Sequence, residues 1–303
     1  MGRGAVPDLP LHLRLIRGAL RRLNISLSRR RERPNARRTA GDSLPGQEAA
    51  LRKLKLDDPA SRAYFEKHLP RLKKTLSLVP PPRSSGRVLE LGCYMHLTPA
   101  LRHYCGFREV RGTDFGAGGL HKSVRYADSL FELEVDLFNA ERDTYPYSAG
   151  YFELVLVCEV IEHMLYDPMH LLLEARRVLE EGGRILITTP NIAGLTSVAR
   201  VLHGHDNPQI HSKYKIPASG PADVQHVREY TMVELGELVA AAGFEIEQLF
   251  TEPIEEYSFY QPLLAFLEEN GYNPSNRGEQ TYCVARKRES LPVTRYPEFL
   301  YER

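Results

Sequence analysis

The chain has 303 residues, a formal net charge of +1 and four cysteines that lie far apart in the sequence. No run of eighteen or more apolar residues occurs, which excludes a membrane-spanning helix of ordinary length. Because no CxxC pair occurs, the cysteines argue against a zinc knuckle or a disulfide framework and favour a reducing compartment. We therefore expect a cytoplasmic protein.

The small net charge hides an asymmetry. Residues 1–40 contain eleven arginines against Asp8 and Glu32, a net charge of +9, so the remaining residues carry −8. Apolar residues follow helical steps within this basic arm, and arginines occupy the other face: Leu13, Ile16, Leu20, Leu23 and Leu27. The pattern suits contact with an anionic membrane surface, an organelle-targeting presequence, or packing on the acidic body or a partner.

We favour packing of the arm or peripheral membrane contact through residues 10–31. Binding of nucleic acid is disfavoured, because the acidic body would repel phosphates. We divide the chain into four parts: 1–46, the basic arm and linker; 47–82, an N-terminal helical cap; 83–290, the main domain; and 291–303, a C-terminal tail. The cap is expected to break near Asp58, which would cap the helix that begins with Pro59.

Strand and helix patterns alternate through the main domain. The predicted strands are 88–91, 109–114, 131–137, 152–157, 184–189, 244–250 and 279–287, and the clearest helices are 168–181 and 231–242. This order predicts an α/β fold, a Rossmann-like doubly wound sheet of seven strands. Residues 191–230 and 252–278 are longer than ordinary connections. We expect these two insertions, with the N-terminal helices, to form a cap over the substrate.

Acidic residues end three of the predicted strands. Glu90 precedes Gly92, where the missing Cβ lets a ligand approach the backbone. Asp114 lies twenty-two residues beyond Gly92, a spacing typical of a carboxylate that binds ribose hydroxyls. Asp136 ends the third strand, where it could hold an adenine amino group. Together the three predict a nucleoside-binding edge of the sheet.

Three short motifs resemble those of the class I S-adenosylmethionine-dependent methyltransferases: VLELGC, TDF and VDLFNA. The stretch FELVLVCEVIEHMLYDP, followed by RVLEEGGRILITTPN, is similar to the branch that includes ubiquinone-biosynthesis O-methyltransferases. The resemblance covers about residues 87–250. It implies an S-adenosylmethionine site formed by these residues: Glu90, Gly92, Cys93, Asp114, Phe115, Asp136, Leu137 and Cys158. In that site Gly92 would face the methionine part, Asp136 and Leu137 would frame the adenine, and Cys158 would contribute its backbone.

The first motif departs from the family pattern of an acid followed by three alternating glycines. Tyr94 and His96 stand where the second and third glycines belong. If Tyr94 required a positive φ, the strain would be about 1–3 kcal/mol. If its side chain pointed inward, it would crowd the cofactor. A non-catalytic protein with a methyltransferase fold is therefore one alternative.

A cluster of possible ligands follows the fourth strand. If a helical turn begins there, Glu159, Glu162 and His163 share one face. His226 precedes a later helix. Carboxylates and imidazoles together suit Mg²⁺, Mn²⁺ or Zn²⁺, so we predict a divalent metal site at Glu159, Glu162, His163 and His226. The alternative is a structural role for the Glu-His pair. Without a metal, His163 is the best candidate for a general base, and Glu162 is the second catalytic candidate.

The expected activity is methyl transfer from S-adenosylmethionine to a small-molecule acceptor, with a hydroxyl of a sugar, quinone or secondary metabolite as the favoured target. The ExxEH pattern with a later histidine also resembles the Hen-type RNA 2′-O-methyltransferases, which implies metal-dependent RNA methylation as an alternative. The second alternative is the non-catalytic scaffold.

Overall fold

The computed structural model describes residues 46–83, 85–204, 207–209, 226–254 and 261–302. The predicted arm, except for Gly46, lies outside the described residues, and so does its predicted membrane contact through 10–31. Within the part that is described, none of the helices combines the length and the apolar character needed to cross a bilayer.

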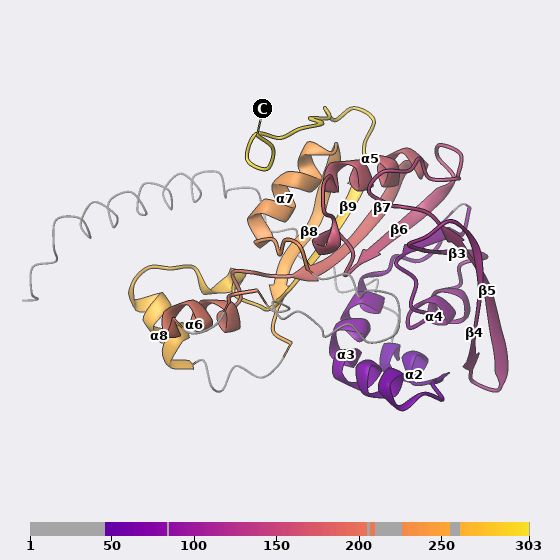
Figure 1. The fold of residues 1–303 in the computed structure, drawn as a ribbon, viewed down its shortest axis with the longest axis horizontal. Coiled ribbons are helices and arrows are strands. Elements are labelled where there is room, and N and C mark those ends of the chain that lie inside the picture. The colour runs from indigo at the N-terminus through magenta and orange to yellow at the C-terminus, as the bar shows by residue number, and fades with distance from the viewer. Residues whose placement is uncertain (1–45, 84, 205–206, 210–225, 255–260, 303) are drawn as a thin grey trace, which may run out of the picture. The chain divides into compact units, whose positions relative to one another are not determined.

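The described strands form one sheet around a parallel centre (Figure 1). Their order across the sheet is β1 (Leu54–Lys55), β4 (Gly118–Tyr126), β5 (Ser129–Leu137), β3 (Glu109–Asp114), β2 (Arg87–Leu91), β6 (Phe152–Cys158), β7 (Leu179–Pro190), β9 (Gln280–Lys287) and β8 (Phe244–Glu252). The strands from β5 to β7 pair in parallel, and the pairs at both sides are antiparallel. This is the predicted Rossmann-like doubly wound arrangement.

All seven predicted strands are present, but the count of seven was wrong: the described residues contain nine. β4 occupies the place between β3 and β5 where an α/β unit has a helix, and it forms a hairpin with β5. β1 has two residues and pairs only with the end of β4. Neither strand has a strong sequence signal, since one is too short and the other exposes most of its side chains.

The helices flank the sheet. In chain order they are α2 (Gln47–Leu51), α3 (Pro59–Leu78), α4 (Thr98–His103), α5 (Pro168–Val178), α6 (Leu195–His203), α7 (Met232–Ala241) and α8 (Gln261–Glu269), with 3-10 turns η1 (Ile161–His163) and η3 (Pro274–Asn276). The predicted break before α3 is confirmed, because Asp58 accepts a hydrogen bond from the Ser61 N–H at 2.6 Å. The predicted helix over 168–181 ends earlier, at Val178, because β7 begins at Leu179.

Alternate residues of the central strands contribute to two hydrophobic cores, one on each face of the sheet. On one face Val155 and Val157 of β6 pack with α5 and α7. On the other face Leu154 and Leu156 pack with α2, α3 and α4. Figure 1 shows the two sets of helices on opposite sides of the strands. Both faces of β6 are therefore buried, as its uninterrupted apolar sequence predicts.

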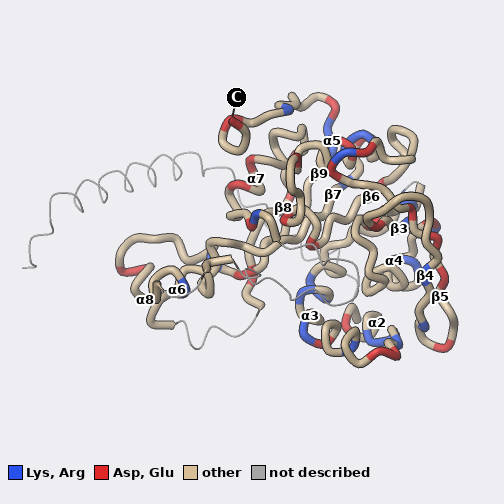
Figure 2. Tube along the Cα trace, viewed as in Figure 1, with Lys and Arg blue, Asp and Glu red and all other residues tan. Residues whose placement is uncertain are grey.

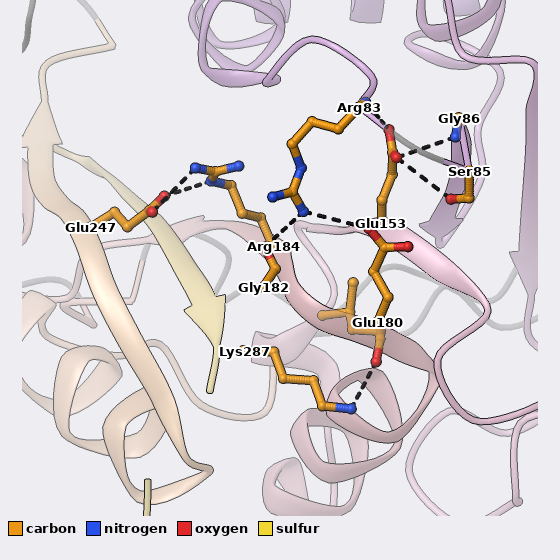
Figure 3. Close-up of polar contacts among 10 residues, drawn as sticks. Arg83, Ser85, Gly86, Glu153, Glu180, Gly182, Arg184, Glu247 and Lys287 are labelled. Atoms are coloured by element: carbon orange, nitrogen blue, oxygen red, sulfur yellow. Dashed lines mark hydrogen bonds and ion pairs between the residues drawn. The ribbon is translucent and has the colours of Figure 1, made fainter. Parts of the chain in front are cut away.

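Buried Glu153 fixes the amino end of the sheet, away from the predicted ligand edge (Figure 3). Its carboxylate accepts hydrogen bonds from the backbone N–H groups of Arg83 at 3.0 Å and Gly86 at 3.2 Å. The Arg83 guanidinium donates to the carbonyl of Gly182 at 2.9 Å. These bonds attach the segment before β2 to β6 and to the start of β7.

The two insertions meet each other. α6 of the first packs against α8 of the second. At their base, the Asn191 side-chain amide donates to the carbonyl groups of Asn276 at 2.9 Å and Gly278 at 2.7 Å. Their predicted role as a substrate cap stays a prediction. On α3 basic side chains outnumber acidic ones (Figure 2). Exposed pairs such as Arg52–Glu48, at 2.9 Å, contribute little stability.

Candidate active site

Gly92 directly follows β2 and has a conformation that strains any larger residue. Its φ is +66°, and a Cβ built on it would lie 2.8 Å from Cγ2 of Val160, in the segment after β6. Two loops at the carboxyl edge of the sheet therefore approach each other closely at this point. The missing Cβ of Gly92 is therefore needed for packing against Val160, and the predicted approach of a ligand to this backbone stays a prediction.

The residues that replace the family glycines are accommodated in different ways. Tyr94 is not the strained residue; Met95 is left-handed instead, with φ of 66°, and is buried. The Tyr94 side chain is 71% exposed, beside Lys122, whose Nζ lies 5.9 Å from the ring centroid. His96 stacks on Tyr64 of α3, with ring centroids 5.4 Å apart, and burial lowers the pKa of its imidazole to about 4.

Glu90 is buried beneath the same loop. Its carboxylate accepts a hydrogen bond from the Thr98 hydroxyl at 2.6 Å, and burial raises its pKa to about 7. The Cys93 thiol lies 3.2 Å from the same hydroxyl, and burial raises its pKa to about 12. A thiol with such a pKa stays protonated near neutral pH, which supports packing rather than a nucleophilic role.

Asp114 stands at the tip of β3 with partners on both oxygens. Oδ1 accepts from the backbone N–H of Phe115 at 2.8 Å, and Oδ2 accepts from the ammonium of Lys122 at 2.7 Å. Each oxygen keeps a second lone pair, and the side chain is 36% exposed, so the carboxylate can accept from ribose hydroxyls. The Phe115 side chain is 73% exposed. Lys122 on β4 was missed by the sequence reasoning.

Asp136 and Leu137 lie on opposite faces of β5. In the register Asp136 pairs with Thr113 and Leu137 pairs with Asp114, so only Leu137 shares the face of the ribose candidate. The Asp136 carboxylate accepts hydrogen bonds from Arg111 and from the Tyr147 hydroxyl, both at 2.6 Å and both on Oδ2. One oxygen of Asp136 thus has structural partners, and its role toward adenine stays a prediction.

Cys158 ends β6 at the centre of the edge, and Glu159 follows it. Burial raises the pKa of the Cys158 thiol, which keeps it neutral. Glu159 is left-handed, with φ of 57°, and its Oε1 accepts hydrogen bonds from Thr188 and Gln280 at 2.8 Å each. Arg71 of α3, a buried cation that the sequence reasoning missed, lies 3.5 Å from the same oxygen.

The predicted helical face shared by Glu159, Glu162 and His163 does not form. The turn begins only at Ile161, and the left-handed backbone of Glu159 directs its side chain toward Thr188. The structure instead brings together Glu162, His163 and His226, whose ligand atoms all lie within 4.8 Å of one another. Three of the four predicted metal ligands therefore meet, and Glu159 does not join them.

Glu162 is the buried member of this triad. Its Oε2 accepts a hydrogen bond from the Thr189 hydroxyl at 2.9 Å, whereas Oε1 has no hydrogen-bond partner. Nε2 of His226 lies 3.9 Å from Oε1, and Nε2 of His163 lies 4.0 Å from it. Burial, and then the nearby Glu159 carboxylate, raise the pKa of Glu162 well above its usual value.

Glu229 completes the arrangement behind His226. Nδ1 of His226 lies 3.0 Å from Oε1 of Glu229, which is itself buried. The carboxylate thereby leaves Nε2 of the imidazole to face Glu162. The sequence reasoning missed Glu229, although its spacing of three residues from a candidate ligand is a usable signal.

The profile of a methyltransferase domain family matches residues 62–249, more than half of the chain. A probable S-adenosylmethionine-dependent methyltransferase of Mycolicibacterium smegmatis is 30% identical over 167 residues, which are 54% of this chain and 54% of that protein. The chain thus spans about half the length of that relative.

Solved structures of methyltransferases align with lower identity. A protein of Thermotoga maritima is 17% identical with a TM-score of 0.46, covering 76% of this chain and 95% of its own. One of Mesorhizobium loti is 16% identical with a TM-score of 0.43, covering 73% and 98%. With its family match across α3 to β8 and its Rossmann-like sheet, the protein belongs to the class I S-adenosylmethionine-dependent methyltransferases.

Proposed function

We propose that this protein transfers a methyl group from S-adenosylmethionine to a hydroxyl of a small molecule, using Glu162, His163 and His226. One observation carries the proposal: Oε1 of Glu162 is buried without a hydrogen-bond partner and faces two imidazoles. An orphaned buried carboxylate oxygen is costly unless a proton or a cation completes it. Glu162 and His163 follow the end of β6, at the edge where α/β sheets bind ligands, and His226 joins them from the segment before α7.

The residues of the first loop fit S-adenosylmethionine. Gly92 lets the first loop turn at the carboxyl end of β2, beside the proposed place of the methionine part, and Asp114 has lone pairs for the ribose. Leu137 lies on the face of Asp114, where it would contact the adenine, and Glu90 would hold the loop through Thr98. When bound, the cofactor supplies an electrophilic methyl group on a cationic sulfur.

The triad also fits a divalent cation. The Nε2 atoms of His226 and His163 lie 3.9 and 4.0 Å from Oε1 of Glu162. These distances are somewhat longer than the distance of about 3.3 Å between ligand atoms around a tetrahedral zinc ion. A modest movement of the imidazoles would therefore complete the site. A cation there would lower the pKa of an acceptor hydroxyl. Without a cation, His163, the most exposed of the three at 25%, would be placed to take the proton itself.

The acceptor is proposed to bind beneath the two insertions, which are joined at Asn191. Divalent cations and imidazole bases both activate hydroxyls, which favours O-methylation over transfer to carbon. A sugar, quinone or secondary metabolite would suit such a pocket. Methylation of an RNA 3′ end and a non-catalytic role are the competing outcomes of the test.

The experiment uses the full chain stripped of metal with a chelator. Binding of S-adenosylhomocysteine is measured by calorimetry, and binding of Mn²⁺ by the loss of its free-ion resonance signal. Methyl transfer from labelled S-adenosylmethionine is then followed with catechols, sugars, quinols and a short RNA. The variants are Glu162→Gln and His163→Gln, with exposed Glu237→Gln as the control.

We expect the wild-type protein to bind both probes and to methylate a small hydroxylated acceptor in a Mn²⁺-dependent reaction. Glu162→Gln should lose Mn²⁺ binding and turnover, while S-adenosylhomocysteine binding persists. Full turnover in both triad variants would exclude these residues from the reaction. Absence of S-adenosylhomocysteine binding would favour the non-catalytic scaffold, and methylation confined to RNA would favour the nucleic-acid alternative.

A further inference from the structure

Lys122 occupies an unusual position beside the first loop. It lies on β4, the strand that stands where an α/β unit would place a helix after β3. In the register Lys122 pairs with Leu133 of β5, whose side chain packs with Cys93 and Met95 of the first loop. A helix in this place would present different side chains to the loop. The position of Lys122 beside the first loop therefore depends on the strand that this chain forms in place of a helix.

The Lys122 ammonium joins the loop to the acidic strand tip. Its Nζ donates to the carbonyl oxygen of Cys93 and to Oδ2 of Asp114, both at 2.7 Å. An ammonium group has three donors, so one N–H remains beyond these two described acceptors. The side chain is 21% exposed, next to the 36% exposed carboxylate of Asp114. A donor and an acceptor thus stand side by side at an open edge of the sheet.

We propose that Lys122 is a second binding residue of the ribose subsite, and this rests on the proposed use of S-adenosylmethionine. A vicinal diol carries two hydroxyls, each able to donate and to accept a hydrogen bond. Asp114 can only accept, whereas Lys122 can only donate. The pair therefore matches both hydrogen-bonding capacities of the diol. The contact of Lys122 with the Cys93 carbonyl also holds the first loop, in which Tyr94 and His96 replace the second and third glycines of the family pattern.

The test measures binding of S-adenosylhomocysteine and its 2′-deoxy and 3′-deoxy analogues to the full chain by calorimetry. The variants are Lys122→Met and Lys122→Arg. Arg125→Met is the matched control, because Arg125 is an exposed cation of the same strand. Urea unfolding of each variant reports whether the fold is kept.

We expect Lys122→Met to weaken S-adenosylhomocysteine binding by about tenfold, the loss of one charged hydrogen bond. The same variant should lose much of the wild-type preference for the full ribose over at least one deoxy analogue. Lys122→Arg should restore part of both, and Arg125→Met should change neither.

Two results would overturn the assignment of Lys122. One is wild-type affinity in Lys122→Met, and the other is weaker binding with the ribose preference unchanged, which would confine the lysine to holding the loop. If Lys122→Met fails to fold, the decision rests on Lys122→Arg. The proposal is then rejected if Lys122→Arg discriminates between the full ribose and the deoxy analogues as strongly as the wild-type protein does. Failure of the wild-type protein to bind S-adenosylhomocysteine would instead refute the proposed function itself.

Discussion

Nδ1 of His226 lies 3.0 Å from Oε1 of Glu229, and its other nitrogen lies 3.9 Å from Glu162. A buried carboxylate thus orients an imidazole whose other nitrogen faces a second buried carboxylate. Histidine ligands of metals commonly have such a carboxylate behind them. The contact with Glu229 thus fixes the orientation of His226 in the proposed site.

Glu229→Gln should weaken Mn²⁺ binding by about ten- to a hundredfold, because loss of an outer partner disturbs the orientation and basicity of His226. Loss of the free-ion signal on titration measures the affinity. Glu237→Gln, an exposed change on α7, should leave it unaltered. Unchanged Mn²⁺ affinity in Glu229→Gln would show that the His226–Glu229 contact only stabilises the loop.

The two glutamates of the ExxEH motif should respond differently to substitution. Glu162→Gln should reduce Mn²⁺ affinity by about a hundredfold or more, since a ligand atom is lost. Glu159→Gln should reduce it less, through the lost negative charge alone, because Oε1 of Glu159 is held by Thr188 and Gln280. Equal losses in the two variants would contradict the separation of the two side chains.

Gly92→Ala should destabilise the protein more than Gly106→Ala. Both glycines have positive φ, at +66° and +84°, so alanine costs about 1–3 kcal/mol of backbone strain at either position. Only at Gly92 would the new Cβ also meet Val160, at 2.8 Å, whereas nothing lies within 4 Å at Gly106. Urea unfolding of both variants measures the difference. Equal losses would mean that the loop after β6 moves away freely.

Glu90 should make stability fall as pH rises. Its pKa is raised in the folded protein from 4.5 to about 7, so the folded state binds the proton more tightly than the unfolded state. Its contribution is complete below pH 4.5 and is lost as pH rises through 7, a change of roughly 3 kcal/mol. Urea unfolding between pH 4.5 and 8 checks this.

The variant Glu90→Gln cannot titrate and should remove that part of the pH dependence. Glu268→Gln, on the exposed side of α8, serves as the control and should keep the wild-type slope. A wild-type slope in Glu90→Gln would assign the pH dependence to another group.

Much of the fold was predictable, because the pattern of burial along each strand is local. The apolar run of β6 and the alternation in β5 identify strands without any knowledge of their neighbours. β4 was not predicted because its sequence lacks a pattern of buried residues. It pairs with β5 along nine residues through backbone hydrogen bonds, while most of its side chains are exposed. The ubiquinone-related branch and the arm's membrane contact stay predictions.

The candidate site, like the fold, was predictable only in part. Gly92, Asp114 and Glu162 were found because each lies at or after the carboxyl end of a strand, and parallel strands bring these ends to one edge. The sequence could not separate Glu159 from Glu162, since a positive φ at Glu159 depends on its contacts with β7 and β9.

By itself, the sequence determined the order of seven strands and the acidic residues at their tips, because hydrophobic periodicity and spacing are encoded within each segment. Only the tertiary structure decided which side chains meet: His226 with Glu162, sixty-four residues earlier, and Lys122 with the carbonyl of Cys93. Such meetings depend on loop closure and packing between distant segments, which no local pattern specifies.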